Sequence, residues 1–136
     1  MRVTPTLFSL ARAVSRRASL GAAGEAFVAQ WFERAGYEVL ARNWSCRVGE
    51  LDLVVRSKSV LVFVEVRTVS TQWLASPTVS IRPAKQARVA RAADAWIRST
   101  GATPGLIRFD VAGVLARRGE LTLEHIQDAF VPPWAY

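Results

Sequence analysis

The chain has very few of the residues that build thiol, zinc and disulfide chemistry. It contains one cysteine, Cys46, and one histidine, His125, among 136 residues. A single cysteine excludes an intramolecular disulfide, which fits a reducing cytoplasm. The two residues are far apart in sequence, so they make a poor case for a catalytic thiol, and the Cys and His clusters of a zinc site are missing. We therefore expect a cytoplasmic protein that uses neither a thiol nor zinc.

Long apolar runs and acidic residues are also scarce. No segment approaches the ~20 apolar residues of a membrane span. The apolar stretch at 7–14 is interrupted by Ser9 and Arg12, so we expect no cleaved signal peptide. The 11 acidic residues are outnumbered by 18 basic ones, giving a net charge of +7. That surplus favours a polyanionic partner, most often nucleic acid. Sixteen of the basic residues are arginine, however, and a GC-rich genome would give the same bias.

The rest of the composition predicts one folded domain with a basic arm before it. Half of the chain is hydrophobic, and 136 residues are enough for one real core. Residues 1–18 carry four arginines and no acid, so we interpret them as an amphipathic or disordered arm. That arm either touches phosphate or reflects an upstream start with no role. Residues 19–131 form the domain, and residues 132–136 form a C-terminal tail.

Hydrophobic periodicity predicts an alternation of helices and strands. Helical stripes cover 19–35, capped by Ser19, and 83–99, which begins with Pro83. Strands are expected at 37–42, at 106–115, at 121–126 and in a hairpin whose two strands flank a break at 57–59. Residues 43–48 are expected to form a turn or bulge, and 68–83 a long loop. This order predicts an α/β sandwich with a mixed sheet of about five strands flanked by helices.

The register of the hairpin follows from its two apolar faces. Leu51, Leu53 and Val55 should meet Val66, Val64 and Val62, because a slip by one residue would turn one set to the wrong side. The opposite face then places Asp52 across from Glu65, Glu50 across from Arg67, and Val54 across from Phe63.

Two carboxylates directly opposite on a sheet lie roughly 5 Å apart and repel each other. A divalent cation between Asp52 and Glu65 would remove the repulsion, since carboxylate oxygens are preferred ligands of Mg²⁺ and Mn²⁺. A solvated face would also tolerate the pair, although the nearby Phe63 and Val54 favour a covered surface. A third acid, Glu25, borders the buried stripe of the first helix and points beside the core.

These residues fall in a pattern that resembles a known nuclease superfamily. The chain is similar to the PD-(D/E)xK, restriction-endonuclease-like superfamily, and more closely to the small bacterial YraN family, which is compared with archaeal Holliday-junction resolvases. The resemblance covers about residues 20–131. It rests on Gly21-x-x-Gly24-Glu25-x-x-Val28-Ala29, Gly36-Tyr37, Arg42-Asn43, Gly49-Glu50-Leu51-Asp52-Leu53 and Phe63-Val64-Glu65-Val66-Arg67. It continues with Lys85, the helix through Ala92 and Trp96, Arg108-Phe109-Asp110-Val111, His125-Ile126 and Ala129-Phe130.

The resemblance implies a role for each matching position. Asp52 and Glu65, with the backbone carbonyl of Val66, would hold one or two Mg²⁺ or Mn²⁺ ions. Glu25 would match the helix acid that resolvases add. The superfamily's usual lysine is replaced by Arg67, which can hold a phosphate but cannot accept a proton. Either the metal alone supplies hydroxide, or Lys85 takes the missing role, or activity is lost.

The implied activity is metal-dependent hydrolysis of DNA phosphodiester bonds, in branched or other structured DNA. Arg82, Lys85 and Arg88 on the second helix would grip the backbone without reading sequence. Cutting a junction at two symmetric points would need a homodimer. Two other functions remain open, a nucleic-acid-binding domain without turnover and a protein-interaction module. The metal hypothesis fails if Asp52 and Glu65 diverge to opposite sides of the sheet, or if a lysine bridges them and leaves no room for a cation.

Overall fold

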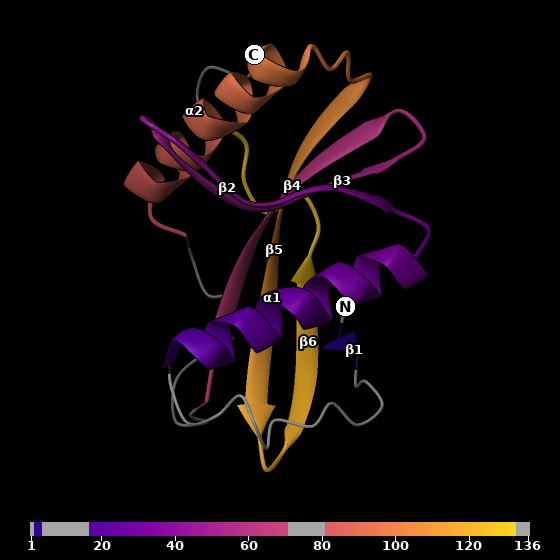
Figure 1. Ribbon diagram of the computed structural model, residues 1–136, viewed down its shortest axis with the longest axis vertical. Coiled ribbons are helices and arrows are strands. Elements are labelled where there is room, and N and C mark those ends of the chain that lie inside the picture. Colours follow the sequence, from indigo (N-terminus) through magenta and orange to yellow (C-terminus); the bar gives the residue numbers. More distant parts are fainter. Residues whose placement is uncertain (1, 4–16, 71–80, 133–136) are drawn as a thin grey trace.

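A computed structural model of the chain describes residues 2–3, 17–70 and 81–132 (Figure 1). Two helices and six strands follow one another along the chain. In order they are β1 (Arg2–Val3), α1 (Arg17–Arg34), β2 (Glu38–Cys46), β3 (Gly49–Ser57), β4 (Val60–Val69), α2 (Pro83–Thr100), β5 (Leu106–Arg117) and β6 (Glu120–Ile126). The predicted alternation of helix, three strands, helix and two strands is confirmed.

The strands form one mixed sheet in the order β1-β6-β5-β4-β3-β2. In the described part of the sheet, neighbouring strands are antiparallel except β4 and β5, which are parallel and are connected through α2. A parallel pair needs such a crossover, because a short turn cannot return the chain to the same end of the sheet. The two-residue β1 joins the edge at β6, so part of the N-terminal arm is a strand. Residues 17 and 18 of the predicted arm belong to α1, and residues 1 and 4–16 lie outside the described residues.

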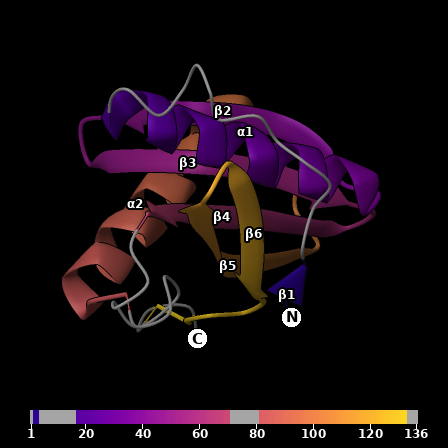
Figure 2. The same cartoon turned by 90° about the horizontal axis from the view of Figure 1, so that it is seen from below.

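The helices cover opposite faces of the sheet, as Figure 2 shows. One apolar cluster lies between α1 and the sheet and is centred on Phe32, Val28, Val62 and Val64. The other lies between α2 and the opposite face and is centred on Phe63, Val54 and Trp96. The strands alternate between the two clusters because successive side chains point to opposite faces. This arrangement is the predicted α/β sandwich.

The hairpin of β3 and β4 has the register that its two apolar faces require. Leu53 pairs with Val64, Val54 with Phe63, and Val55 with Val62. The predicted break of three residues is too long, because Ser57 pairs with Val60 and only Lys58 and Ser59 form the turn. Lys58 has a φ of 54°, the left-handed conformation that a tight hairpin turn demands.

Leu51 lies on the other face from the one predicted. It packs in the cluster under α2, while Leu53 and Val55 pack under α1. The alternation breaks beside an irregular part of the neighbouring strand β2, where the register shifts between Val39 and Ala41 and Asn43 adopts a φ of 48°. Ala41 and Trp44 on either side of Asn43 therefore both pack in the cluster under α2, as do their partners Val54 and Leu51. The predicted turn at 43–48 is accordingly shorter, since β2 continues through this irregular position to Cys46.

The helix limits differ slightly from those predicted. Pro83 starts α2 as expected, and the left-handed Gly101 (φ 70°) ends it. Ser19 is not the cap of α1, because the helix already begins at Arg17. The predicted loop at 68–83 is shorter at its start, where β4 runs to Val69, and its centre at 71–80 lies outside the described residues.

Candidate active site

The two predicted metal ligands meet where the β3–β4 ladder ends. Its last pair is Leu53 with Val64, and Asp52 and Glu65 are the next residues. The Val66 N–H donates a hydrogen bond of 2.8 Å to Oδ2 of Asp52. The Asp52 carboxylate thus occupies the place between the strands where a backbone acceptor would lie. The structure does not continue the ladder to the predicted pairs Leu51 with Val66 and Glu50 with Arg67.

Glu65 points toward α2 and is almost fully buried. Its Oε1 forms an ion pair with Nζ of Lys85 at a distance of 3.0 Å. The Glu65 side chain is 9% exposed and the Lys85 side chain 42% exposed. Lys85 therefore pairs with one carboxylate of the site and does not bridge both. The two acids also lie close together, because each shifts the pKa of the other.

Burial and a neighbouring negative charge raise the pKa of both carboxylates. Burial first, and then the negative charge of Asp52, raise the pKa of Glu65 to about 7, against the opposing effect of Lys85. Burial also raises the pKa of Asp52, and the nearby Glu50 adds to this. The hydrogen bond from Val66 and the charge of Lys85 oppose the rise. A cation between two such carboxylates would relieve the repulsion that these shifts reflect.

Glu25 approaches the same site from α1. Burial and then the charge of Asp52 raise its pKa, while a hydrogen bond from the Asn43 side chain lowers it. The preceding residue, Gly24, explains how the helix comes so near. A Cβ at Gly24 would overlap Oγ1 of Thr68, so only glycine allows α1 to lie directly against the end of β4.

A second glycine fixes the other side of the site. A Cβ at Gly49 would lie 3.0 Å from the backbone oxygen of Arg88, closer than a side chain normally approaches. The start of β3 therefore runs directly against α2. Gly24 thus brings α1 close to β4, which carries Glu65, and Gly49 brings α2 close to β3, which carries Asp52.

A cleft of about 370 Å³ opens beside Glu65, between the end of β4 and the start of α2. Its wall consists of one acid, one apolar side chain and four cations, namely Glu65, Ile81, Arg67, Arg82, Lys85 and Arg88. The structure thus brings the predicted phosphate-binding residues to one hollow with the predicted metal ligand Glu65. The excess of positive charge in this hollow suits an anionic ligand.

The donor set fits a hard cation such as Mg²⁺. In the ranges 2–3, 17–70 and 81–132, no group of three or more His, Cys, Asp or Glu side chains is arranged for a metal. Mg²⁺ needs fewer protein ligands, since it keeps several waters and typically takes one or two carboxylates. The backbone N–H and C=O of one strand residue point to the same side, so the Val66 carbonyl points toward Asp52, as its N–H does. These two carboxylates and this carbonyl are the oxygens that the resemblance predicts as ligands.

Sequence reasoning assigned no role to Asn43, which touches the site through Glu25. Its register position between Arg42 and Trp44 places it opposite Asp52 on the neighbouring strand. The sequence signal that could have pointed to Asn43 is an asparagine in a segment without regular alternation. Asparagine adopts the left-handed backbone conformation more readily than most residues.

Asp110 and His125 form a separate buried centre. Oδ1 of Asp110 accepts a bond of 2.8 Å from Nε of Arg108, and its Oδ2 lies 2.7 Å from Nε2 of His125. The Asp128 N–H donates a further bond of 3.0 Å. Asp110 is thus the buried partner of both Arg108 and His125.

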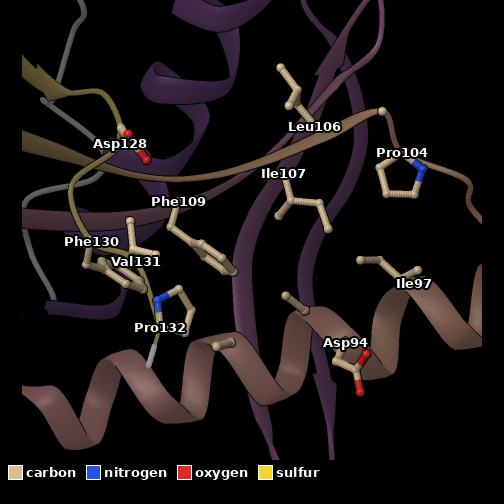
Figure 3. A pocket seen from close by; sticks show the side chains of 13 residues that line it. Asp94, Ile97, Pro104, Leu106, Ile107, Phe109, Asp128, Phe130, Val131 and Pro132 are labelled. Atoms are coloured by element: carbon tan, nitrogen blue, oxygen red, sulfur yellow. The ribbon is translucent and has the colours of Figure 1, made fainter. Parts of the chain in front are cut away.

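A larger hollow of about 580 Å³ lies elsewhere, between α2 and β5 (Figure 3). Its visible lining is mostly apolar and includes Ile97, Ile107, Phe109 and Phe130. The acid Asp94 at its rim already pairs with Arg98 at 2.9 Å. The hollow contains none of the predicted site residues, so the candidate chemistry lies in the smaller cleft.

In the described part of the chain, no helix is long and apolar enough to cross a membrane.

Comparison with known proteins gives the family of the chain. Residues 24–114 match the model of "Uncharacterised protein family UPF0102". A UPF0102 protein of Leifsonia xyli is 40% identical over 102 residues, which are 75% of this chain and 86% of the relative. A UPF0102 protein of Streptomyces griseus is 40% identical over 114 residues, 82% of this chain and 96% of the relative. One from Anaeromyxobacter dehalogenans is 42% identical over 114 residues, 84% and 85% of the two chains. The chain therefore belongs to the UPF0102 family.

Proposed function

We propose that the protein is a metal-dependent nuclease that hydrolyses DNA phosphodiester bonds. The observation that carries the proposal is the meeting of Asp52 and Glu65 at the end of the β3–β4 ladder, beside a cleft lined by four cations. The PD-(D/E)xK and YraN-like pattern supports the same activity, with Mg²⁺ or Mn²⁺ as the cofactor. Structured or branched DNA is the proposed substrate, and the cytoplasm the proposed compartment.

Each side chain of the site has a part in this reaction. Asp52, Glu65 and the Val66 carbonyl would hold the cation. A bound divalent cation lowers the pKa of its water and neutralises charge on the phosphoryl oxygens. Arg67 and Lys85 would stabilise the charge that grows on the phosphate, and Arg82 and Arg88 at the wall of the cleft would bind neighbouring phosphates. Glu25 would add an acid from the α1 side.

One observation favours a second function, nucleic-acid binding without turnover. Position 67 carries arginine where the superfamily has lysine, and an arginine cannot accept a proton from water. Lys85 is the nearest lysine to the pair, but its ammonium is engaged by Glu65 at 3.0 Å. A binding domain would keep the cationic cleft and dispense with hydrolysis.

Cleavage of defined DNA separates the two functions. Wild type and Glu65→Gln would be incubated with labelled linear, flapped and four-way DNA, with Mn²⁺ or with a chelator. A nuclease cuts at least one substrate only with Mn²⁺, and the variant loses the cut. A binding domain retards DNA on a gel with or without metal and leaves it intact. Equal cutting by both proteins would reveal a contaminant, and neither binding nor cutting would favour a protein-interaction module.

A further inference from the structure

We infer that the Lys85 ammonium holds the place of a divalent cation at Glu65, and turns into the cationic cleft when the cation binds. The inference rests on the proposed function and adds to it a coupling between the cation and the phosphate. Lys85 would then be a positioning residue for Glu65 in one state and a phosphate contact in the other.

The position of Lys85 allows both contacts. Its Nζ lies 3.0 Å from Oε1 of Glu65, yet 42% of the lysine side chain is exposed. The same side chain lines the cleft with Arg82 and Arg88. Lys85 is in the first turn of α2, which starts at Pro83, so its backbone is held while its flexible four-carbon stem can swing. Only a side-chain rotation is needed to move from the carboxylate to the cleft.

The identity of the residue supports an exchange. The chain has two lysines and sixteen arginines, and the other lysine, Lys58, is in the hairpin turn. The other cations of the cleft are all arginine. An arginine at position 85 could hold Glu65 through two parallel hydrogen bonds. A lysine offers one compact charge, which a doubly charged cation between two carboxylates can displace more readily.

The exchange would couple two binding events. Without the cation, the Lys85 ammonium neutralises the Glu65 carboxylate and contributes less positive charge to a phosphate in the cleft. With the cation, Glu65 is satisfied by the metal and Lys85 becomes a fourth phosphate-binding cation in the cleft. Because coupling between two sites is reciprocal, DNA would strengthen binding of the cation by the same factor.

Calorimetric titration with Mn²⁺ alone tests the first half of the inference. Lys85→Met should bind Mn²⁺ about three- to tenfold more tightly than wild type. In this variant Mn²⁺ no longer has to displace the partly exposed Lys85 ammonium from Glu65. Lys85→Arg should bind it more weakly. Lys58→Met is the matched control and should equal wild type. Arg88→Met removes another positive charge from the wall of the cleft and keeps the ion pair of Lys85 with Glu65, so it should change Mn²⁺ affinity much less than Lys85→Met.

DNA binding tests the second half. The probe is a labelled duplex oligonucleotide, titrated with Ca²⁺ or with a chelator, since Ca²⁺ takes the same oxygen ligands. In wild type, Ca²⁺ should strengthen binding, and Lys85→Met should show a smaller gain. Arg88→Met should weaken binding in both conditions and keep the full gain.

The inference is overturned if Lys85→Met binds Mn²⁺ no better than wild type, or if Arg88→Met has the same effect. It is also overturned if the Ca²⁺ gain is unchanged in Lys85→Met. These results would leave the proposed nuclease intact wherever wild type still binds Mn²⁺ and cuts DNA. If wild type binds no Mn²⁺ at this pair, the proposed function and the inference both fail.

Discussion

Asp110 and Glu65 are buried carboxylates on neighbouring strands, and their surroundings shift the pKa in opposite directions. Asp110 pairs in register with Val64, the residue before Glu65, so the two acids point to opposite faces of the sheet. Burial alone would raise the pKa of Asp110, but hydrogen bonds from His125, Arg108 and Asp128 outweigh it and hold that pKa below its usual value. Glu65 has Lys85 and a repelling acid, and its pKa rises to about 7.

The difference separates a structural centre from a candidate functional one. Asp110 is saturated with donors and connects β5 to β6 and, through Arg108 and its bond of 3.2 Å to the Tyr37 hydroxyl, to the start of β2. Nothing further is needed to stabilise its charge. The Asp52–Glu65 pair has more negative charge than its protein partners neutralise, a pattern typical of functional sites. The following predictions separate the two centres, from the largest expected effect to the smallest.

Removing the charge of Asp110 should cost the most stability. Asp110→Asn leaves Arg108 and His125 without their carboxylate in a buried place, so the free energy of unfolding should fall by about 3–5 kcal/mol. Urea denaturation followed by tryptophan fluorescence measures it. Asp94→Asn on the exposed face of α2 is the matched control. A loss under about 1 kcal/mol would show that the buried network contributes little.

Glu65 should make the metal-free protein less stable as the pH rises. Its folded pKa of about 7 lies above the ordinary value of 4.5, so the folded state binds more protons than the unfolded state between these values. Stability should therefore fall as the pH rises from about 4.5 to 7, by roughly 1–3 kcal/mol.

The Glu65→Gln variant tests this sign. In the presence of a chelator it should remove most of the fall and be more stable than wild type at pH 8. Thermal melts at several pH values follow the effect. A Glu65→Gln protein that is less stable than wild type at pH 8 would mean that the ion pair with Lys85 outweighs the repulsion from Asp52.

The exposed ion pair of Asp94 and Arg98 should contribute the least to the free energy of unfolding. Their side chains are 55% and 79% exposed at a separation of 2.9 Å, one turn apart on α2. Arg98→Ala should lower the free energy of unfolding by only about 0.3–0.5 kcal/mol, and less in high salt. A loss as large as that of Asp110→Asn would show that burial does not determine the energies compared here.

The sequence predicted the elements and the central register because these follow from period and pairing. Leu53, Val55, Val62 and Val64 could meet in only one way, and this also brought Asp52 and Glu65 together. The α/β sandwich followed from the order of the elements.

The rest depended on local backbone conformation and on long-range contacts. Periodicity assumes regular strands, so it could not foresee that Leu51 would lie on the α2 face beside the irregular strand β2. The ion pair of Lys85 with Glu65 depends on how α2 lies across the sheet. The donors that surround Asp110 come from β5, β6 and the segment after β6, and spacing along the chain does not show that these segments meet.

Cation binding by the Asp52–Glu65 pair is the claim on which the functional account depends. Wild type, Asp52→Asn and the control Asp94→Asn would be titrated with Mn²⁺ by calorimetry, with thermal melts at the same concentrations. Wild type and Asp94→Asn should bind Mn²⁺ and gain stability as its concentration rises, and Asp52→Asn should lose both. Binding should also strengthen from pH 6 to pH 8, because the ligands must be deprotonated. Equal Mn²⁺ binding by all three proteins, or none by wild type, would contradict the account.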